Sequence, residues 1–481
     1  MKKFGLIAAL ALLASPACGE QLPDIPSNFD VNEWLHPVPP DTSNVAAPGS
    51  SAEGAFRFVC NHAKFGMFDP IVSPGQDKVG HWHEFYGNMD MNPSSTYESL
   101  RSSGHGTCHG GPINRSAYWH PAMMDGQGNF IKMSGASIYY KAPVVGTAAA
   151  VTSLPRGLRF ITGFNMGDIN GVHPNKANWG ILTNNVWKTA TPLPKSISEA
   201  LSTMTEPLQP TTLDPTRPSW SPFSVDTSLL MQLSSPNCWD GVNLDSPNHR
   251  SHVSFKIRDA STNWVAKCPP GWVEIPQFTI GPRWQIFHGD DVSKWHIASD
   301  HHAQTLPGGS AHADWFGGWD FEIMERWIQH CLREVRSSVE GNLCDGQNLK
   351  RAPEYRTWFL AAGESRVPIP IDGTPEPEPP PVQPPEPPPT PPTVRFDTPA
   401  PGTAYGGNAR IEIASMAMHA SGIKTTTISL NGAVLARCAT TPPCTTSARA
   451  KDLREGGNSL SAVAVNNLGL SETATITIIG K

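Results

Sequence analysis

Alternation of apolar and polar residues is the main structural signal in the first three quarters of the chain. Several short segments alternate with the period of two that is typical of half-buried strands, and residues that favour turns separate them. This pattern predicts a β-rich fold. The predicted strands are residues 55–60, 136–141, 157–162, 251–257 and 284–288.

One segment has helical periodicity instead. Met324, Trp327, Cys331 and Val335 recur at spacings of three and four residues, which places them on one face of a helix. Asp320 precedes this stripe and can cap the first turn. The sequence therefore predicts one helix over residues 320–337 that packs its apolar face on the sheet.

A proline-rich run divides the chain. Twelve of the twenty residues in 374–393 are proline, and such a run adopts an extended polyproline II form that cannot build a core. We assign residues 372–393 as a linker. The segment 394–481 alternates again in short strands, resembles bacterial immunoglobulin-like modules, and is expected to be a small β-sandwich that serves as a spacer. Its predicted strands are residues 409–414, 424–430, 433–436, 459–465 and 473–479.

The first residues have the features of an export signal. Lys2 and Lys3 precede an apolar run over residues 4–14, which is too short to span a bilayer. Residues 1–18 are therefore expected to be a signal peptide. Cys18 is a candidate for a lipid anchor, although Ser15 stands where a lipobox has a bulky aliphatic residue. We expect a secreted or cell-envelope protein.

The remaining boundaries follow from these segments. A proline-rich lead over residues 19–50 precedes the main domain over residues 51–371. No internal repeat divides that domain, so we expect one large β-sandwich-like domain with few helices.

Cysteine usage agrees with export. Eight cysteines remain beside Cys18, and an even number in an exported chain indicates a disulfide framework. None has the CxxC spacing of a zinc or redox site. We expect nearest neighbours to pair as Cys60–Cys108, Cys238–Cys268, Cys331–Cys344 and Cys438–Cys444.

Composition limits the partners and locates the chemistry. The formal net charge is −6 and no basic cluster occurs, which argues against nucleic-acid binding. No segment after the signal is long and apolar enough to predict a transmembrane helix. All fifteen tryptophans and sixteen of the seventeen histidines precede the linker. The chemistry is therefore expected in the first domain.

Three clusters carry candidate chemistry. In the first, His81 and His83 would project from one face of a strand, where two imidazoles can hold a transition metal or act as acid and base. The alternative is that both satisfy buried backbone groups.

The second cluster lies in residues 238–252. It contains Asp240, Asp245, His249, Arg250 and His252, and a loop with so many ionisable groups is often a site. The alternative is a loop held together by side-chain hydrogen bonds.

The third cluster precedes the predicted helix. His312 and Asp314 have strand spacing, and Trp315 and Trp319 could offer a platform for sugar rings. Tryptophans in a large β-domain are more often part of the core. His301 and His302 are expected to be solvated.

The ordered blocks of the first domain resemble a secreted family of bacteria and fungi known as domain of unknown function 1996. The resemblance covers about residues 56–331, with Glu84 where many bacterial members have aspartate. It implies an exported, disulfide-bearing domain and names no reaction. The blocks include FRFVC at 56–60, DPIVSPG at 69–75, HWHEFYGN at 81–88, NRSAYW at 114–119, CWDG at 238–241 and HRSH at 249–252.

Two classes of function remain open. The first is an enzyme that acts on a polysaccharide, either as a hydrolase with two opposed carboxyl groups or as a lyase with a His or Tyr base. The second is a non-catalytic protein that binds a metal or a glycan. The candidate catalytic residues are His83, Asp240, Asp245, His249 and Asp314; those for substrate binding are Asn114, Arg115, Tyr118, Trp119, Trp239, Arg250 and Trp315; and those for a divalent transition metal are His81, His83, His252 and His312.

Overall fold

The computed structural model divides the chain into two compact units, residues 1–380 and 381–481, which are described separately. The division falls within the proline-rich run. The predicted signal and Cys18 lie outside the described residues, and so does most of the proline-rich run. The described residues are 21–38, 53–142, 151–173, 175–214, 216–217, 223–258, 266–338, 340–351, 360–370, 391–419, 422–439, 443–467 and 469–481.

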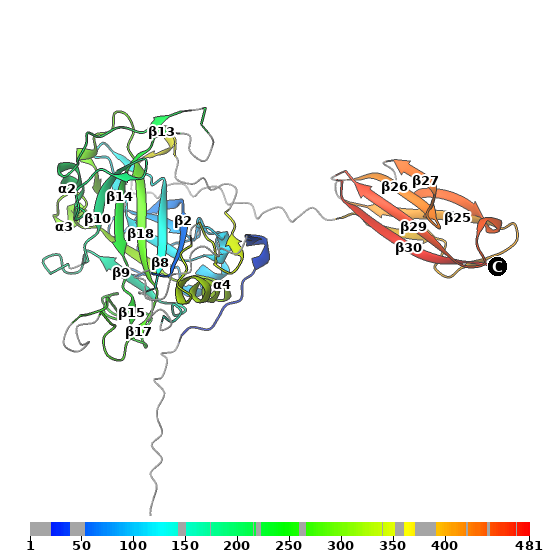
Figure 1. The fold of residues 1–481 in the computed structure, drawn as a ribbon, viewed down its shortest axis with the longest axis horizontal. Helices are drawn as coiled ribbons and strands as arrows, with labels where there is room; N and C mark the ends of the chain where they lie inside the picture. The colour runs from blue at the N-terminus through cyan, green and yellow to red at the C-terminus, as the bar shows by residue number, and fades with distance from the viewer. Residues whose placement is uncertain are drawn as a thin grey trace, which may run out of the picture. The chain divides into compact units, whose positions relative to one another are not determined.

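A six-stranded antiparallel sheet forms one layer of the first unit (Figure 1). Its strands, in spatial order, are β11 (Val186–Trp187), β10 (Asn178–Thr183), β14 (Thr227–Ser234), β18 (Gln277–Gln285), β8 (Gly135–Lys141) and β2 (Ala55–Cys60).

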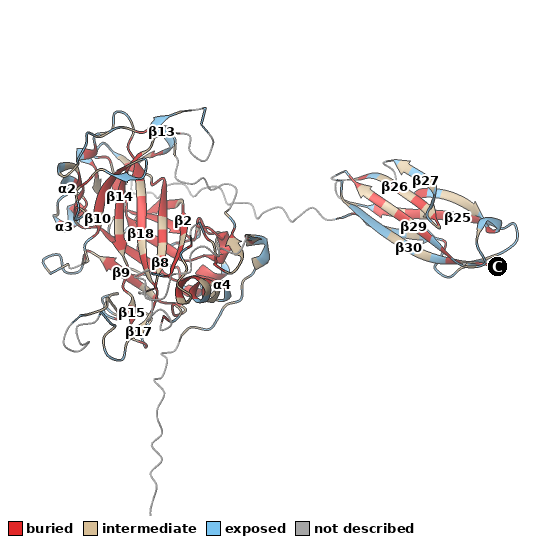
Figure 2. Cartoon of the chain, viewed as in Figure 1, coloured by how far each residue is buried: buried red, intermediate tan, exposed pale blue. Residues whose placement is uncertain are grey.

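A five-stranded antiparallel sheet forms the other layer. It packs on the first through Tyr118, whose hydroxyl lies 2.9 Å from that of Tyr140, and through Trp315, whose ring centroid lies 5.5 Å from that of Phe278. The core between the sheets is therefore rich in aromatic side chains, and Figure 2 shows the strands largely buried. In spatial order the strands are β3 (His62–Gly66), β4 (His83–Gly87), β5 (Ala117–Pro121), β20 (His312–Phe316) and β9 (Arg159–Gly163).

Smaller sheets surround this sandwich. They are β1 (Leu35–Pro37) with β21 (Gln347–Leu349), β12 (Thr212–Leu213) with β13 (Phe223–Val225), β16 (Val253–Ser254) with β15 (Cys238–Trp239) and β17 (Val273–Glu274), and β19 (His296–Ile297) with β6 (Met123–Met124), β7 (Asn129–Ile131) and β22 (Arg366–Pro368).

The helices are short. The predicted helix over residues 320–337 appears as α4 (Phe321–Trp327), capped by Asp320, whose side chain accepts a hydrogen bond from the Ile323 amide. It continues as a π-helical turn over Ile328–Arg333. The remaining α-helices in the described ranges are α1 (Tyr97–Ser102), α2 (Ile197–Ser202) and α3 (Asp300–Ala303).

Two strand predictions need correction. Within residues 251–257 the strand is limited to Val253–Ser254, with an isolated bridge from Ile257 to Lys267, because Asn248 Oδ1 accepts hydrogen bonds from the amides of Arg250 and Ser251 and folds the start of the segment into a turn. The strand predicted at 284–288 ends at Gln285 and begins at Gln277. The sequence pattern did not predict the first part of this strand, because it contains Gly281 and Pro282 and both residue types usually interrupt strands.

The second unit consists of two sheets around an aliphatic core. Residues in β25 alternate between exposed and buried, as the sequence pattern predicts. The sequence pattern did not predict the strands β23, β24 and β28. One sheet has three strands in the spatial order β23 (Thr393–Thr398), β25 (Arg410–Met418) and β28 (Cys444–Arg449). The other has five strands in the order β24 (Ala404–Tyr405), β30 (Ser471–Gly480), β29 (Gly456–Asn466), β26 (Ile423–Leu430) and β27 (Ala433–Ala439).

The mostly β fold class is confirmed, and so are the four disulfides. No helix in the described ranges is long and apolar enough to cross a membrane. The disulfides join Cys60 to Cys108, Cys238 to Cys268, Cys331 to Cys344 and Cys438 to Cys444.

Candidate metal and acid-base centre

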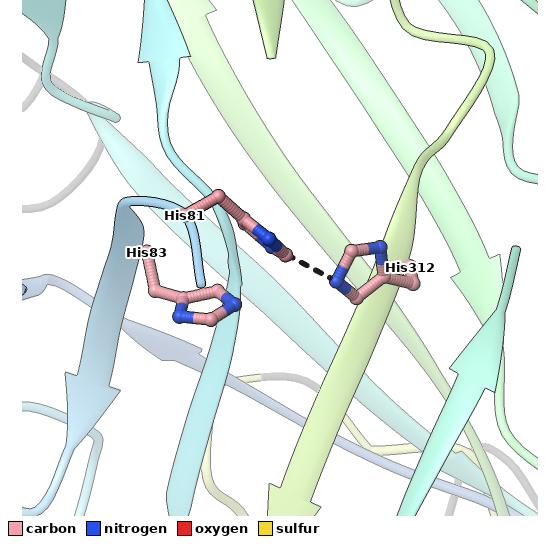
Figure 3. Close-up of side chains that lie close together, drawn as sticks. All are labelled: His81, His83 and His312. Carbon is pink, nitrogen blue, oxygen red and sulfur yellow. Dashed lines mark hydrogen bonds between the residues drawn. The ribbon is translucent and has the colours of Figure 1, made fainter. Parts of the chain in front are cut away.

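Three histidines meet at the outer face of the five-stranded sheet. His83 begins β4, His312 begins β20, and His81 lies two residues before β4. One potential ligand atom of each ring lies within 4.8 Å of the others. The Nε2 atoms of His81 and His312 are 3.2 Å apart (Figure 3).

Strand alternation explains this placement. Successive side chains of a strand point to opposite faces, so Tyr118 and Trp315 enter the core while Trp119 and Asp314 face outward. The register pairs Trp119 with Asp314 and with Phe85. His83 and His312 each lie two residues from one of these outward positions, and therefore share the outer face.

Backbone carbonyls fix the orientation of two of the rings. The Nδ1–H of His83 donates to the Phe68 carbonyl at 2.9 Å, and the Nδ1–H of His312 donates to the Ser310 carbonyl at 2.9 Å. A carbonyl can only accept, so each proton is at Nδ1 and each Nε2 keeps its lone pair. That tautomer is the one needed for metal binding through Nε2.

Burial keeps all three rings neutral. The pKa of His83 falls to about 3 through burial and the neighbouring His312. The pKa values of His81 and His312 fall well below 6.5, chiefly through burial and then through the adjacent histidines. At neutral pH the rings are therefore in the unprotonated form that can coordinate a metal.

Two carboxyl groups adjoin the histidines. Ligand atoms of Asp69, His83 and Asp314 lie within 4.8 Å of one another. Asp314 is fully buried, and neither of its oxygens has a hydrogen-bond partner among the described residues. Burial, followed by repulsion from Asp69, raises the pKa of Asp314 well above its usual value.

Asp69 has a different environment. Its Oδ1 accepts hydrogen bonds from the amides of Ile71 and Val72, and its Oδ2 accepts one from Trp119 Nε1 at 3.4 Å. These bonds lower the pKa of Asp69, but burial outweighs them and raises it. Sequence reasoning missed Asp69 as a site residue, although it opens one of the blocks that carry the family resemblance.

The loop of the second sequence cluster, residues 238–252, lies against this centre. His249 Nδ1 is 2.8 Å from Asp245, which also accepts a hydrogen bond from Arg159. Electrostatic interaction with His249 lowers the pKa of Asp69, while Arg250 lowers that of Asp314. The three sequence clusters therefore come together through His81 and His83, His249 and Arg250, and His312 and Asp314.

Other members of the same loop hold its own conformation. His252 uses both ring nitrogens, bonding to Ser246 Oγ and to the Arg159 carbonyl. Asp240 accepts from the amides of Val242 and Asn243 and so holds a turn. Trp239 is buried and donates to the Asn243 carbonyl. The structure thus engages Asp240, Trp239 and His252 in hydrogen bonds that hold this part of the chain.

The predicted sugar contacts near residue 115 are engaged in hydrogen bonds or packing within the fold. Arg115 donates to the carbonyls of Gly104 and Arg101. Asn114 is buried, and its Oδ1 accepts from the Ser116 amide. Tyr118 and Trp315 lie in the core between the sheets, because they occupy the inward positions of their strands. Trp119 faces outward beside Asp69, and His301 and His302 are exposed, as expected.

Comparison with known proteins identifies the lineage. Residues 69–319, just over half of the chain, match the family described as domain of unknown function DUF1996. The chain belongs to the DUF1996 family. The match includes all the residues of the centre. No curated protein matches this DUF1996 chain.

Solved structures overlap this DUF1996 protein weakly. Fibronectin(III)-like modules of Clostridium thermocellum CbhA match at 20% identity and a TM-score of 0.17, over 19% of this chain and 47% of that one. A modular Cellulomonas fimi endo-β-1,4-mannanase matches at 13% and 0.14, over 32% of each chain. A polysaccharide lyase matches at 8% and 0.15, over 88% of this chain and 40% of that one. The chain spans less than half of each structure, and these TM-scores carry no assignment.

Proposed function

We propose that the first unit is a metal-dependent enzyme that cleaves a polysaccharide outside the cell. The metal is a transition ion, with zinc the first candidate, held by His81, His83 and His312. Asp314 and Asp69 form the acid-base pair beside it.

The convergence of three neutral imidazoles carries this proposal. Zinc–nitrogen bonds of 2.0–2.1 Å in a tetrahedral site place two ligand nitrogens about 3.3 Å apart, and the Nε2 atoms of His81 and His312 are 3.2 Å apart. His83 Nε2 is buried without a hydrogen-bond partner among the described residues. An imidazole nitrogen left unpaired in this way fits a missing ion, because burying a polar atom unpaired is unfavourable.

A three-histidine set suits catalysis, since catalytic zinc sites have three protein ligands and one open position. When bound, such an ion supplies Lewis acidity and activates water. Asp314 can hold a proton because its pKa is raised, and Asp69 is held in place by two backbone amides. Together the carboxyl groups can donate and accept the proton that the cleavage of a glycosidic bond requires.

Features elsewhere in the chain support an extracellular polymer as substrate. The first residues read as an export signal, four disulfides are present, and a separate β-unit follows a proline-rich segment. Disulfides persist in oxidising compartments outside the cytosol. Both a hydrolase and a lyase are compatible with these residues, and they differ in product: only a lyase leaves an unsaturated sugar that absorbs in the ultraviolet.

The alternative is a metal-binding protein without catalysis. The burial of the centre favours it: His83 is 2% exposed and Asp314 is fully buried. A structural ion needs no access for substrate, whereas an enzyme requires the open side of the ion to reach solvent.

Metal analysis of the purified full chain tests the proposal. We expect about one ion per chain, lost in His83→Ala and retained in His288→Ala, a matched change at an exposed histidine. A well-folded wild-type chain without metal would overturn the metal site.

Activity separates the enzyme from the binding protein. Release of reducing ends from a panel of soluble polysaccharides should fall by about 10²- to 10⁴-fold in Asp314→Asn. Metal binding without cleavage of any polysaccharide would support the alternative. Asp314→Asn that cleaves at the wild-type rate would remove Asp314 from the mechanism.

A further inference from the structure

A depression of about 280 Å³ adjoins the histidine centre. Ile161 and Gly163 of β9 line it, and in the antiparallel register they pair with Asp314 and His312 of β20. Paired residues of neighbouring antiparallel strands lie about 5 Å apart. The wall of the depression is therefore one strand away from the proposed metal and acid-base residues.

Arg250 connects the two places. It lines the depression, and its charge acts on both Asp314 and His312. Its guanidinium donates to the carbonyls of Gly163 and Phe164 at 3.1 and 2.7 Å. These bonds use two of its five N–H groups, so the anchored side chain retains donors for a ligand.

The rest of the lining suits a sugar. The side-chain amide nitrogen of Asn175 donates hydrogen bonds to Thr162 Oγ1 and to the Ser234 carbonyl. The side-chain oxygen of Asn165 accepts a hydrogen bond from the Gly167 amide. One end of each amide is left without a further bond among the described residues. Val172, 92% exposed, and the half-buried Phe255 add apolar surface for the C–H faces of a sugar ring.

The charge of the lining indicates which sugar. Among the described residues that line the depression, Arg250 is the one with a permanent charge, and none is Asp or Glu. This contrasts with a chain whose net charge is −6. An anchored arginine on a wall whose lining has no Asp or Glu favours a carboxylate ligand, because guanidinium and carboxylate are geometrically matched.

We infer that this depression binds a uronate unit of an acidic polysaccharide, with Arg250 facing its carboxylate, next to the bond that is cleaved. The inference rests on the proposed function for its place beside the cleavage centre. It assigns Arg250, Asn165 and Asn175 to substrate binding and predicts preference for polyuronates over neutral glycans.

Opposite charge changes at Val172 test the location without disturbing the core. Binding of the full chain to polygalacturonate is measured by titration calorimetry. Val172→Glu should weaken binding by about threefold and Val172→Lys should strengthen it by about threefold, as expected for one charge a few ångströms from a polyanion in water. High salt should remove both effects. Val186→Glu, at a valine 57% exposed on β11, is the matched control and should bind as wild type.

Misfolding cannot give shifts of opposite sign, so the pair remains informative if one variant loses stability. Wild-type affinity in both Val172 variants would refute the location. Galactomannan bound as tightly as polygalacturonate would refute the acidic substrate.

Metal analysis of the same samples separates the two proposals. A chain without metal that still shows the charge effect would refute the proposed enzyme and retain the binding site. A metal-loaded chain without the charge effect would refute the binding site alone.

Discussion

His109 gives a quantitative test of the electrostatics of the first unit. It is buried, its Nδ1 lies 2.9 Å from the Val59 amide nitrogen, and its Nε2 lies 2.7 Å from the guanidinium of Arg351. A neutral imidazole has one accepting nitrogen and so can accept from one of these two donors, whereas a protonated ring would place an N–H against each of them. Burial, followed by Arg351 and Arg57, lowers the pKa of His109 to about 3.

The sign of the pH dependence follows directly. The folded pKa lies below the unfolded value of 6.5, so the unfolded chain binds the proton first as pH falls. The stability that neutral His109 provides is complete above pH 6.5 and is lost toward pH 3. At ~1.4 kcal/mol per pH unit, the wild type loses about 2 kcal/mol at this site by pH 5 and about 5 kcal/mol by pH 3.

The perturbation is His109→Gln, which removes the titrating group. Its lost hydrogen bonds lower the free energy of unfolding at every pH, but its pH profile should be flatter than that of the wild type. The gap between the two proteins should narrow by about 2 kcal/mol between pH 6.5 and pH 5.

Urea unfolding followed by tryptophan fluorescence is the assay. All fifteen tryptophans precede the proline-rich run, so the signal reports the first unit alone. Contributions from the other buried histidines are common to both proteins and cancel in the difference. Parallel pH profiles would refute the pKa assigned to His109.

Two further changes test the fold by the same assay. Replacing Cys60 and Cys108 with serine removes a link between residues 48 apart and should cost about 4 kcal/mol by loop entropy; an unchanged urea midpoint would contradict this. Trp315→Ala should cost about 3–5 kcal/mol because the side chain is 1% exposed between the sheets. The exposed change Val186→Ala should stay within about 0.5 kcal/mol of wild type, and equal losses in the two variants would refute the placement of Trp315 in the core.

Local patterns were sufficient for much of the fold. Alternation located β2 and β8 to within one residue and located the start of β25, which continues four residues past its predicted end. The cap at Asp320 and the apolar spacing after it located α4. Nearest-neighbour pairing of cysteines matched all four disulfides. These features depend on interactions between residues near one another in the chain, or on a simple ordering rule, and both are visible in the sequence.

The candidate site was visible only as separate pieces. The sequence pattern singled out His81 and His83, the loop around His249, and the segment of His312 and Asp314 as candidates. It did not show that these three segments lie close together in the fold. Trp315 shows the limit clearly: it is adjacent to Asp314, yet strand alternation sends it into the core. The sequence alone suggests a sugar-binding site wherever a polar residue adjoins a tryptophan, because it does not show that the two side chains point to opposite faces of the sheet.

The sequence by itself determined the mostly β fold class, the placement of the histidines and tryptophans before the proline-rich run, and the inventory of groups able to bind metal or transfer protons. Tertiary structure decided which of those groups meet. The order β4-β5-β20 brings His83 within reach of His312, more than 200 residues later in the chain, and the turn after β3 adds Asp69. It also left His252 and Asp240 in loop hydrogen bonds. The physical reason is that strand order and register come from packing across the whole core, whereas alternation along one strand specifies only its two faces.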